Sequence, residues 1–243
     1  ARVFKALGVQ FDVIGNSEEG GNRFYEWAQG NGIRTNVRFG GVGKHRTHDD
    51  TAVVTVPVNA LYEVTKLLIA RGFKHILVEK PGALHTIQMR AIDHLARAAG
   101  ADVRIAYNRR FLNSVQSART IARRDGLRRL HFCFGDDMEA VRKTNHPENV
   151  KRKWITANSS HVIDAALFLG DGVQHIYVES TWPFRGAGYG ADFPISYATD
   201  WDKDHRWRIE FETRAGERYY LAPIEKLTRV DGPGQGTVIA FEE

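Results

Sequence analysis

Cysteine is nearly absent from this chain: Cys133 is the only one in 243 residues, so no disulfide can form within it. Its thiol lies in an apolar strand pattern, 130–134, which favours a buried structural side chain over a nucleophile and is typical of a reducing cytoplasm. Apolar runs long enough to cross a bilayer are lacking, and the first residues do not resemble a signal peptide. We therefore expect a cytoplasmic protein without a membrane partner.

The composition is that of a globular protein, with 42% hydrophobic and 26% charged residues, which is enough to form a sizeable core. Two glycine-punctuated halves favour two domains over one. The net charge is +5, and basic residues cluster at Arg119, Arg123, Arg124, Arg128 and Arg129. Because no aromatic residues interleave with these arginines and no recognised module surrounds them, we interpret them as a solvated helix face rather than a nucleic-acid interface. Their positive field would also suit an anionic small ligand.

Strand and helix patterns alternate over the first part of the chain. We predict strands at 11–14, 35–39, 52–56, 74–78 and 103–106, and helices at 2–7, 22–29, 59–72 and 86–99, with Asn59 as a helix cap. This alternation predicts an α/β fold with a Rossmann-like, doubly wound parallel sheet. The helix at 2–7 has no start signal, so we expect the preceding first strand and turn to be missing. The loop 40–43 is interpreted as a turn, because no apolar helix pattern follows its glycines.

The pattern changes after Phe111. A basic helix at 114–124 and a strand at 130–134 precede a polar stretch, 136–153, which has no clear periodicity and is long enough that we expect it to cover a site. A helix capped by Ser159 or Ser160 ends at Gly170, and strands follow at 173–180, 207–213 and 218–222. Alternating apolar and polar residues at 207–213 indicate a mainly antiparallel sheet with one solvated face.

Two residues are candidates for chemistry. Lys80 follows a buried-strand pattern, and open α/β sheets bind ligands at the carboxyl ends of their strands; a surface ion pair with Glu79 is the alternative. His161 lies in the first turn of a helix, three residues before Asp164, so Asp164 could orient its imidazole. A single histidine on a helix is nevertheless more often structural than catalytic.

A metal site is the competing use of such side chains. His45, His48, Asp49 and Asp50 are close in sequence, but they lie in a loop and lack a recognised ligand spacing. We therefore predict no metal site. The local sequence also contains no Ser-His-Asp or Cys-His arrangement of the kind that nucleophilic catalysis uses.

Four segments together carry a resemblance to a known family. They are Val53–Asn59, Gly72–Pro81 with its Glu-Lys-Pro ending, Ala106–Phe111 and Asn158–Gly170. In this order and spacing they resemble the glucose-fructose oxidoreductase, inositol dehydrogenase and MocA family over nearly the whole chain. The resemblance implies a dinucleotide-binding domain at 1–107. It implies an α+β domain at 108–243 that binds substrate and forms a homodimer or homotetramer through its sheet. The implied activity is that of an NAD(P)-dependent oxidoreductase acting on a hydroxyl or keto group of a sugar, cyclitol or related metabolite.

The resemblance also implies roles for individual residues. Lys80 would lie beside the nicotinamide and the substrate hydroxyl, and His161 would be the acid/base partner. His161 needs little adjustment of its pKa near neutrality, whereas the pKa of Lys80 would have to fall roughly three units from about 10.4. We therefore expect His161 to be the principal acid/base and Lys80 the polarising and relay group, with the reverse left open. The implied cofactor-binding residues are Asn16, Ser17, Arg23, Val56, Pro57, Asn59, Glu79, Lys80 and Asn108. The implied substrate residues are Tyr107, Arg109, Trp154, Asn158, His161 and Asp164, with Trp182, Arg185 and Tyr189 as further candidates for specificity.

The sequence departs from the family pattern in several places. The glycine-rich fingerprint after the first strand is missing, Leu61 stands where many members have a histidine, and Ala157 stands where many have an aspartate. Asn16 and Ser17 provide no acid at the ribose-reading position, and Arg23 could reach a 2′-phosphate, so NADP is slightly favoured over NAD. These departures keep a second interpretation open, in which the chain is a catalytically silent relative that acts as a binding or scaffold protein.

Overall fold

The structure is a computed structural model, and it describes residues 1–45, 49–171, 175–181, 184–190, 192–199 and 207–241. The chain divides into two compact units. The first comprises Ala1–Val56, Ala60–Val78 and Ile87–Arg104, and the second comprises Pro57–Asn59, Glu79–Thr86 and Ile105–Glu243. The segment that carries Lys80 therefore belongs to the second unit, although it follows a strand of the first.

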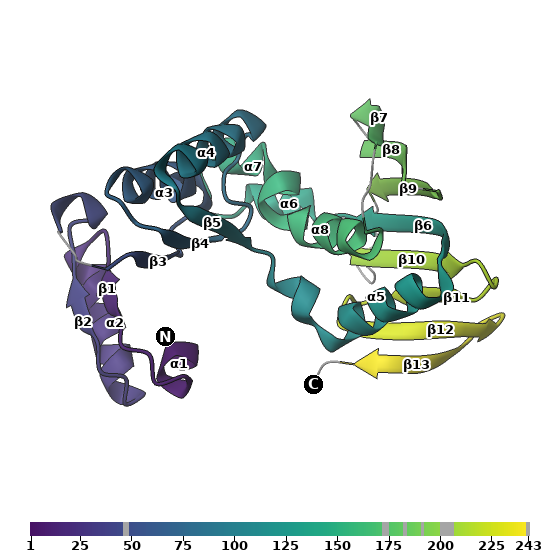
Figure 1. Cartoon of the computed structure of the whole chain (residues 1–243), viewed down its shortest axis with the longest axis horizontal. Helices are drawn as coiled ribbons and strands as arrows, with labels where there is room; N and C mark the ends of the chain where they lie inside the picture. The colour runs from purple at the N-terminus through teal and green to yellow at the C-terminus, as the bar shows by residue number, and fades with distance from the viewer. Residues whose placement is uncertain (46–48, 172–174, 182–183, 191, 200–206, 242–243) are drawn as a thin grey trace. The chain divides into compact units, whose positions relative to one another are not determined.

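The first unit contains two small sheets, one of two strands and one of three (Figure 1). β1 (Asp12–Ile14) pairs in parallel with β2 (Asn36–Arg38), and β3 (Thr51–Val54) pairs in parallel with β4 (His75–Glu79), which also neighbours β5 (Asp102–Ala106). The helices are α1 (Arg2–Ala6), α2 (Glu18–Gly30), α3 (Leu61–Ala70) and α4 (Thr86–Ala99), with 3-10 turns η1 (Val42–Lys44) and η2 (Val58–Ala60). The Rossmann-like alternation predicted from the sequence is confirmed.

Two helix starts differ from the prediction. α2 begins at Glu18 rather than at 22, because Ser17 Oγ accepts a hydrogen bond from the backbone N of Gly20 at 3.2 Å and caps the helix. Asn59 is not a cap: it lies in η2, and α3 begins without a side-chain cap. The first residue of α3, Leu61, is fully buried. Apolar packing therefore fixes the start of this helix in place of a cap.

The second unit is built on an eight-stranded sheet with the order β13-β12-β11-β10-β6-β9-β8-β7. β6 pairs with β9 in parallel, and its pairing with β10 and the other pairings are antiparallel. The strands are β6 (Leu127–Phe134), β7 (His175–Thr181), β8 (Phe184–Tyr189), β9 (Pro194–Thr199), β10 (Trp207–Thr213), β11 (Arg218–Leu221), β12 (Lys226–Gly232) and β13 (Gln235–Phe241). The predicted α+β unit with a mainly antiparallel sheet is confirmed.

Helices α5 (Asn113–Asp125) and α8 (Ser160–Leu169) pack on one face of this sheet (Figure 1). Strand β10 has the predicted alternation, since Ile209 and Phe211 are buried while Arg208 and Glu210 remain partly exposed. The core between helices and sheet includes Val115, Ala118, Leu130, Phe132, Val162, Ala165, Ile209 and Leu221. One face of the sheet thus supplies the core, and the other carries charged side chains.

Two parts of the second unit were not predicted correctly. The polar stretch 136–153 is not an aperiodic loop, because it contains α6 (Met138–Arg142) and α7 (Glu148–Lys151). Strands β8, β9 and β12 were not predicted. Gly186 and Gly188 interrupt the apolar pattern of β8, and Pro194 begins β9, so both read locally as turns. Pairing with neighbouring strands overrides these local preferences.

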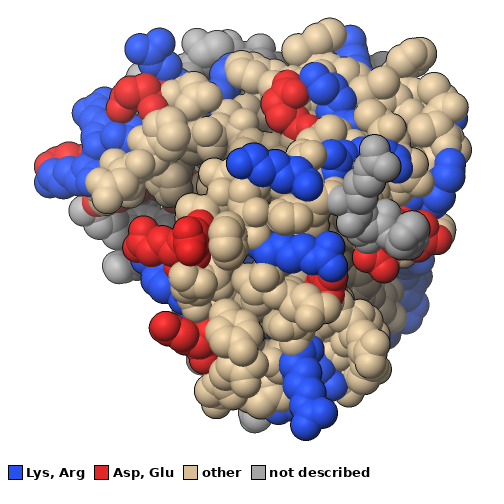
Figure 2. Space-filling view, turned by 90° about the vertical axis from the view of Figure 1, so that its left-hand side faces the viewer, with Lys and Arg blue, Asp and Glu red and all other residues tan. Residues whose placement is uncertain are grey.

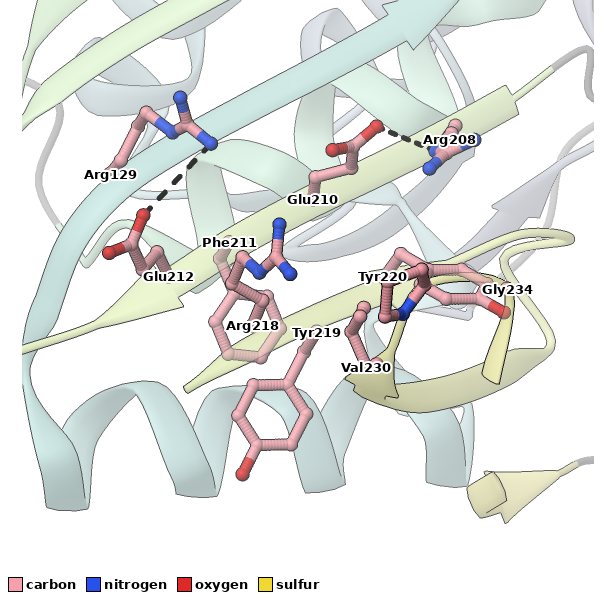
Figure 3. A pocket seen from close by; sticks show the side chains of 12 residues that line it. Arg129, Arg208, Glu210, Phe211, Glu212, Arg218, Tyr219, Tyr220, Val230 and Gly234 are labelled. Atoms are coloured by element: carbon pink, nitrogen blue, oxygen red, sulfur yellow. Dashed lines mark ion pairs between the residues drawn. The ribbon is translucent and has the colours of Figure 1, made fainter. Parts of the chain in front are cut away.

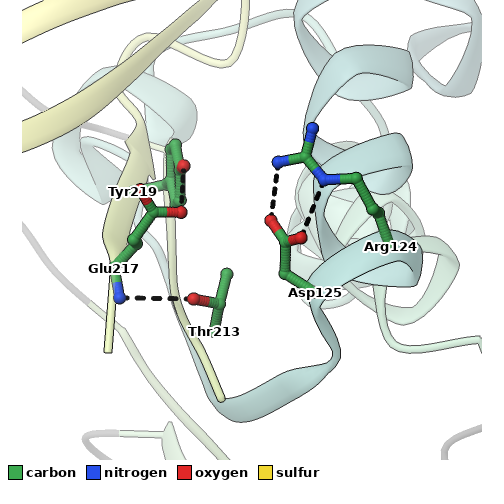
Figure 4. Close-up of polar contacts among 5 residues, drawn as sticks. All are labelled: Arg124, Asp125, Thr213, Glu217 and Tyr219. Carbon is green, nitrogen blue, oxygen red and sulfur yellow. Dashed lines mark hydrogen bonds and ion pairs between the residues drawn. The ribbon is translucent and has the colours of Figure 1, made fainter. Parts of the chain in front are cut away.

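The arginine cluster of α5 and β6 is ion-paired. Arg119 and Arg123 both contact Asp171, Arg124 contacts Asp125 (Figure 4), and Arg128 and Arg129 contact Glu212. Figure 4 also shows Thr213 and Glu217 closing the adjacent β10–β11 turn through a 3.2 Å hydrogen bond. The ion pairs of the five arginines offset much of the positive charge of their cluster, as expected for a solvated helix face.

On the face drawn in Figure 2, basic and acidic side chains are interspersed among uncharged ones. Within the described ranges no helix is long and apolar enough to span a bilayer.

Candidate active site

Lys80 is held in place at its backbone and at its ammonium group. Its Nζ donates a hydrogen bond to the carbonyl oxygen of Ala157 at 2.8 Å. Pro81 to Leu84 are buried, which anchors the segment. Glu79 accepts a hydrogen bond from the backbone N of Lys80 at 3.0 Å instead of pairing with its ammonium. The ammonium is therefore directed into the second unit.

The environment of Lys80 shifts its proton affinity. Burial lowers the pKa of Lys80 below its usual value, the carboxylates of Glu79 and Asp136 raise it, and the nearby Arg109 guanidinium lowers it. The net effect on the pKa of Lys80 is downward. This is the direction that a proton relay near neutral pH requires.

His161 lies in the first turn of α8, next to two aromatic rings. The Tyr107 ring meets it edge-on at a centroid distance of 6.1 Å, and the Trp207 ring lies at 6.1 Å. Its Nδ1 is buried and has no hydrogen-bond partner among the described residues. Burial and, to a smaller extent, the positive charges of Lys80 and Arg109 together lower the pKa of His161 to about 4. The expectation that its pKa needs little adjustment is wrong for the chain alone.

Asp164 does not orient His161, so this prediction is wrong. Both of its carboxylate oxygens bind the guanidinium of Arg110, with Nε at 2.7 Å and Nη2 at 2.5 Å. Arg110 also lies over the ring of Phe168 at 5.1 Å. Charge-assisted bidentate pairing outcompetes a single hydrogen bond to a neutral imidazole. Asp164 therefore fixes the segment that precedes α5 onto α8.

That segment, η3 (Asn108–Phe111) and the residue before it, supplies three of the predicted residues. Tyr107 faces His161, and burial raises the pKa of its phenol. Arg109 donates from Nη1 to Glu225 Oε1 at 2.7 Å, with both side chains about one-third exposed. Asn108 is exposed at the start of η3. Tyr107 and Arg109 thus lie in the same unit as Lys80 and His161.

A buried carboxylate that sequence reasoning missed lies next to Lys80. Asp136, at the end of β6, is 6% exposed. Its Oδ1 accepts from Asn158 Nδ2 at 2.9 Å, and its Oδ2 accepts from Ser159 Oγ at 3.0 Å. Both donors lie in η4 (Ile155–Ser159), a π-helical turn that runs directly into α8. Such turns are frequent at functional sites. An aspartate directly after an apolar strand and Gly135 was the available sequence signal.

Other predicted substrate residues are less closely placed. Trp154 packs against the buried cluster of Leu84, Val150 and Ala157, and its Nε1 has no partner within the described residues. Asn158 is engaged with Asp136, as described above. Trp182 and the side chain of Arg185 lie outside the described residues, and Tyr189 is exposed on β8.

The predicted dinucleotide contacts divide between the units. Asn16, Ser17, Arg23 and Val56 belong to the first unit, and Pro57, Asn59, Glu79 and Asn108 belong to the second. Ser17 caps α2, while Arg23 forms an exposed ion pair with Glu19 at 3.4 Å. The glycine loop 40–43 lies beside Asn16 and is held by Arg71, which donates to the carbonyl oxygens of Val42, Gly43 and His45. Its carbonyls therefore face a cation, as expected of a turn.

The described residues contain no cluster of three His, Cys, Asp or Glu side chains that could hold a metal ion, and His48 lies outside them.

A separate cavity of about 310 Å³ opens on the charged face of the sheet (Figure 3). Arg208 pairs with Glu210 at 2.6 Å and Arg129 with Glu212 at 4.0 Å across its wall. None of the predicted site residues lines it. The candidate chemistry therefore lies around Lys80 and His161, away from this cavity.

The structure has a Rossmann-like unit followed by an α+β sheet unit, a fold also found in solved dehydrogenases. No protein-family model matches the sequence, and no curated protein matches it. The chain is similar in structure to levoglucosan dehydrogenase in complex with NADH and L-sorbose, at 13% identity and a TM-score of 0.71 over 96% of this chain and 70% of that one. It is also similar to the WlbA dehydrogenase of Bordetella pertussis in complex with NADH and UDP-GlcNAcA, at 11% identity and a TM-score of 0.70 over 93% and 70%.

A third similar structure is the super-repressor mutant of Gal80p from Saccharomyces cerevisiae, at 14% identity and a TM-score of 0.77 over 100% of this chain and 74% of that one. At these identities the likeness establishes the fold. The fold that the sequence resemblance implied is thereby confirmed.

Proposed function

We propose that this chain is an NAD(P)-dependent oxidoreductase that transfers a hydride between a nicotinamide cofactor and a hydroxyl or keto group of a sugar, cyclitol or related metabolite. The observation that carries the proposal is the place of Lys80 in the second unit: the carbonyl of Ala157 holds its ammonium at 2.8 Å, and its charge acts on the imidazole of His161 in the same unit. The fold shared with NADH-bound dehydrogenases supports it. Residues 1–107 would bind the dinucleotide, and residues 108–243 would bind substrate and form a homodimer or homotetramer through the sheet.

The chemistry follows from what alcohol oxidation needs. A hydride leaves carbon and a proton leaves oxygen; the nicotinamide accepts the hydride when bound, so the chain must accept the proton. His161 is neutral above its pKa of about 4, so at neutral pH its imidazole is free to accept this proton and would pass it on to solvent rather than hold it. Lys80 uses one N–H on Ala157 and keeps two for the substrate oxygen. In the reverse direction Lys80 polarises the carbonyl, and His161, which holds no proton of its own at neutral pH, would relay one from solvent to the new hydroxyl; exchange of these two roles is the alternative.

The side chains around this pair suit a polyhydroxylated substrate. Tyr107, Arg109 and Asn158 offer a phenol, a guanidinium and an amide, and Trp154 offers an apolar ring face. Asp164 would act here through Arg110 rather than directly. Hydroxyl groups both donate and accept hydrogen bonds, so this mixture of donors, acceptors and one aromatic face matches a sugar or cyclitol better than an apolar ligand.

The residues fit the reacting end of a nicotinamide dinucleotide better than its pyrophosphate. We propose that Lys80 and Asn108 of the second unit and Asn16, Ser17 and Arg23 of the first would contact the cofactor. The loop 40–43 does not offer a phosphate cradle, because its carbonyls bind Arg71. The end of β1 carries Asn16 rather than an acid, and the exposed Arg23–Glu19 pair is weak enough to exchange for a 2′-phosphate. We therefore propose NADP or NAD, with NADP slightly favoured.

A catalytically silent relative that acts as a binding or scaffold protein is the second candidate. Two observations favour it: Ala157 replaces a carboxylate next to Lys80, and a Gal80p super-repressor shares the fold. The two candidates differ in turnover, not in fold.

Turnover tests the proposal. The whole chain is incubated with NADP or NAD and a panel of sugar alcohols, aldoses and cyclitols, and reduced nicotinamide is followed by absorbance. We expect formation of reduced cofactor with at least one substrate, and its loss in Lys80→Met. Lys143→Met, which removes a lysine from an exposed pair with Glu139, is the matched control and should retain the rate. No reduced nicotinamide with any substrate, and no oxidation of NADPH or NADH by the matching keto compounds, would favour the silent relative.

A further inference from the structure

The carbonyl that holds Lys80 belongs to a turn that is itself clamped by a carboxylate. Ala157 O accepts from Lys80 Nζ at 2.8 Å, and the next two residues, Asn158 and Ser159, both donate from their side chains to Asp136. The Ala157 side chain packs in an apolar cluster with Leu84 and Val150, so this position could not itself carry a charge without burying it among apolar groups. The carboxylate that binds this turn is Asp136, which lies two residues after the end of β6.

We propose that Asp136 is the positioning residue and counter-charge for Lys80: it clamps the π-helical turn so that Ala157 presents its carbonyl to the ammonium. The inference rests on the proposed function in assigning Lys80 a catalytic role. Asp136 is only 6% exposed, so we do not expect it to contact a substrate. It would act on Lys80 through its hydrogen bonds to the turn and through its negative charge. A buried carboxylate with both oxygens bonded is rigid enough for such a role.

The electrostatics of the site agree with this geometry. The charges that face Lys80 are Glu79 on its own segment, Asp136 on the strand end and Arg109 before α5, and Lys80 in turn acts on His161 in α8. Burial and Arg109 lower the pKa of Lys80, and Asp136 opposes them. Without Asp136 the ammonium would lose both a counter-charge and a firmly held acceptor, and its pKa would fall further.

The test measures the pKa of Lys80 directly, without turnover. The whole chain is labelled briefly with acetic anhydride over a pH series, and acetylation of Lys80 relative to the exposed Lys153 is read by mass spectrometry. Asp136→Asn is expected to lower the pKa of Lys80 by about one unit. Asp137→Asn removes the same charge one residue further on, where the side chain caps α6, and should leave it unchanged.

A second variant covers the case in which Asp136→Asn does not fold. Ser159→Ala removes one of the two clamping bonds but keeps the carboxylate, and is expected to shift the pKa of Lys80 in the same direction by a smaller amount. An unchanged pKa of Lys80 in every folded variant would overturn the inference. If Asp136→Asn lowers the pKa of Lys80 but the parent chain shows no turnover, the inference about Asp136 holds and the proposed function fails. If the parent chain turns over but Asp136→Asn leaves the pKa of Lys80 unchanged, the proposed function holds and the inference about Asp136 fails.

Discussion

The Arg110–Asp164 pair makes an asymmetric prediction about stability. The Asp164 side chain is 10% exposed and accepts both of its hydrogen bonds from Arg110, whose side chain is 41% exposed. Arg110→Met leaves a buried carboxylate without its cation. Asp164→Ala leaves a guanidinium that water can reach. We therefore expect Arg110→Met to lower the free energy of unfolding more than Asp164→Ala does.

The magnitudes follow from the exposure of each group. Leaving a buried charge unpaired costs about 3 to 5 kcal/mol. We expect a loss of about 3 to 4 kcal/mol for Arg110→Met at pH 7. For Asp164→Ala we expect about 1 to 2 kcal/mol, because the guanidinium regains hydration.

Urea denaturation followed by tryptophan fluorescence measures both effects, with equal m-values required for the comparison. Lys143→Met is the control, because its pair with Glu139 is exposed and contributes at most about 0.5 kcal/mol. Equal losses of unfolding free energy in Arg110→Met and Asp164→Ala would refute the reasoning.

Three further predictions concern catalysis and the core. Lys80→Ala and His161→Ala should each lower kcat at least about 100-fold while near-UV circular dichroism is retained; parental rates in both would contradict their assignment. Because His161 must be neutral to accept a proton, kcat/KM for oxidation should be lost as the pH falls through about 4, not 6.5, and an acid limb near 6.5 would show that its pKa is not lowered. Phe132→Ala, at a site 2% exposed, should lower the free energy of unfolding by about 3 to 5 kcal/mol in urea denaturation; a loss near zero would exclude a core role.

Local periodicity was sufficient to predict most of the first unit. The β-branched run predicted as a strand at 52–56 and the helical spacing of 86–99 correspond to β3 (Thr51–Val54) and α4. These signals come from neighbours within the same element, and burial on one face makes them visible in the sequence. Strands β8 and β9 lacked such a signal, because glycines and a proline that read as turns are held in the sheet by their neighbours.

The sequence pointed to the candidate site residues, but not to the hydrogen bonds and ion pairs that connect them. The sequence motifs pointed to Lys80 and His161, and the structure places both in the second unit. The predicted partner of Asp164 was wrong. Helix spacing points to His161, but the guanidinium of Arg110, which lies far away in sequence, binds the carboxylate more strongly. Asp136 was missed for the same reason: its partners lie more than twenty residues later in the chain. Polar residues that pair over long distances in the sequence produce no periodic pattern from which the pairing could be predicted.

Binding of the cofactor tests the central claim most directly. The whole chain is titrated with NADPH and, separately, with NADH, and energy transfer from tryptophan to the reduced nicotinamide is recorded. The account predicts saturable transfer with at least one dinucleotide, with tighter binding of NADPH. A folded chain that shows no saturable transfer with either dinucleotide would contradict a nicotinamide-dependent oxidoreductase.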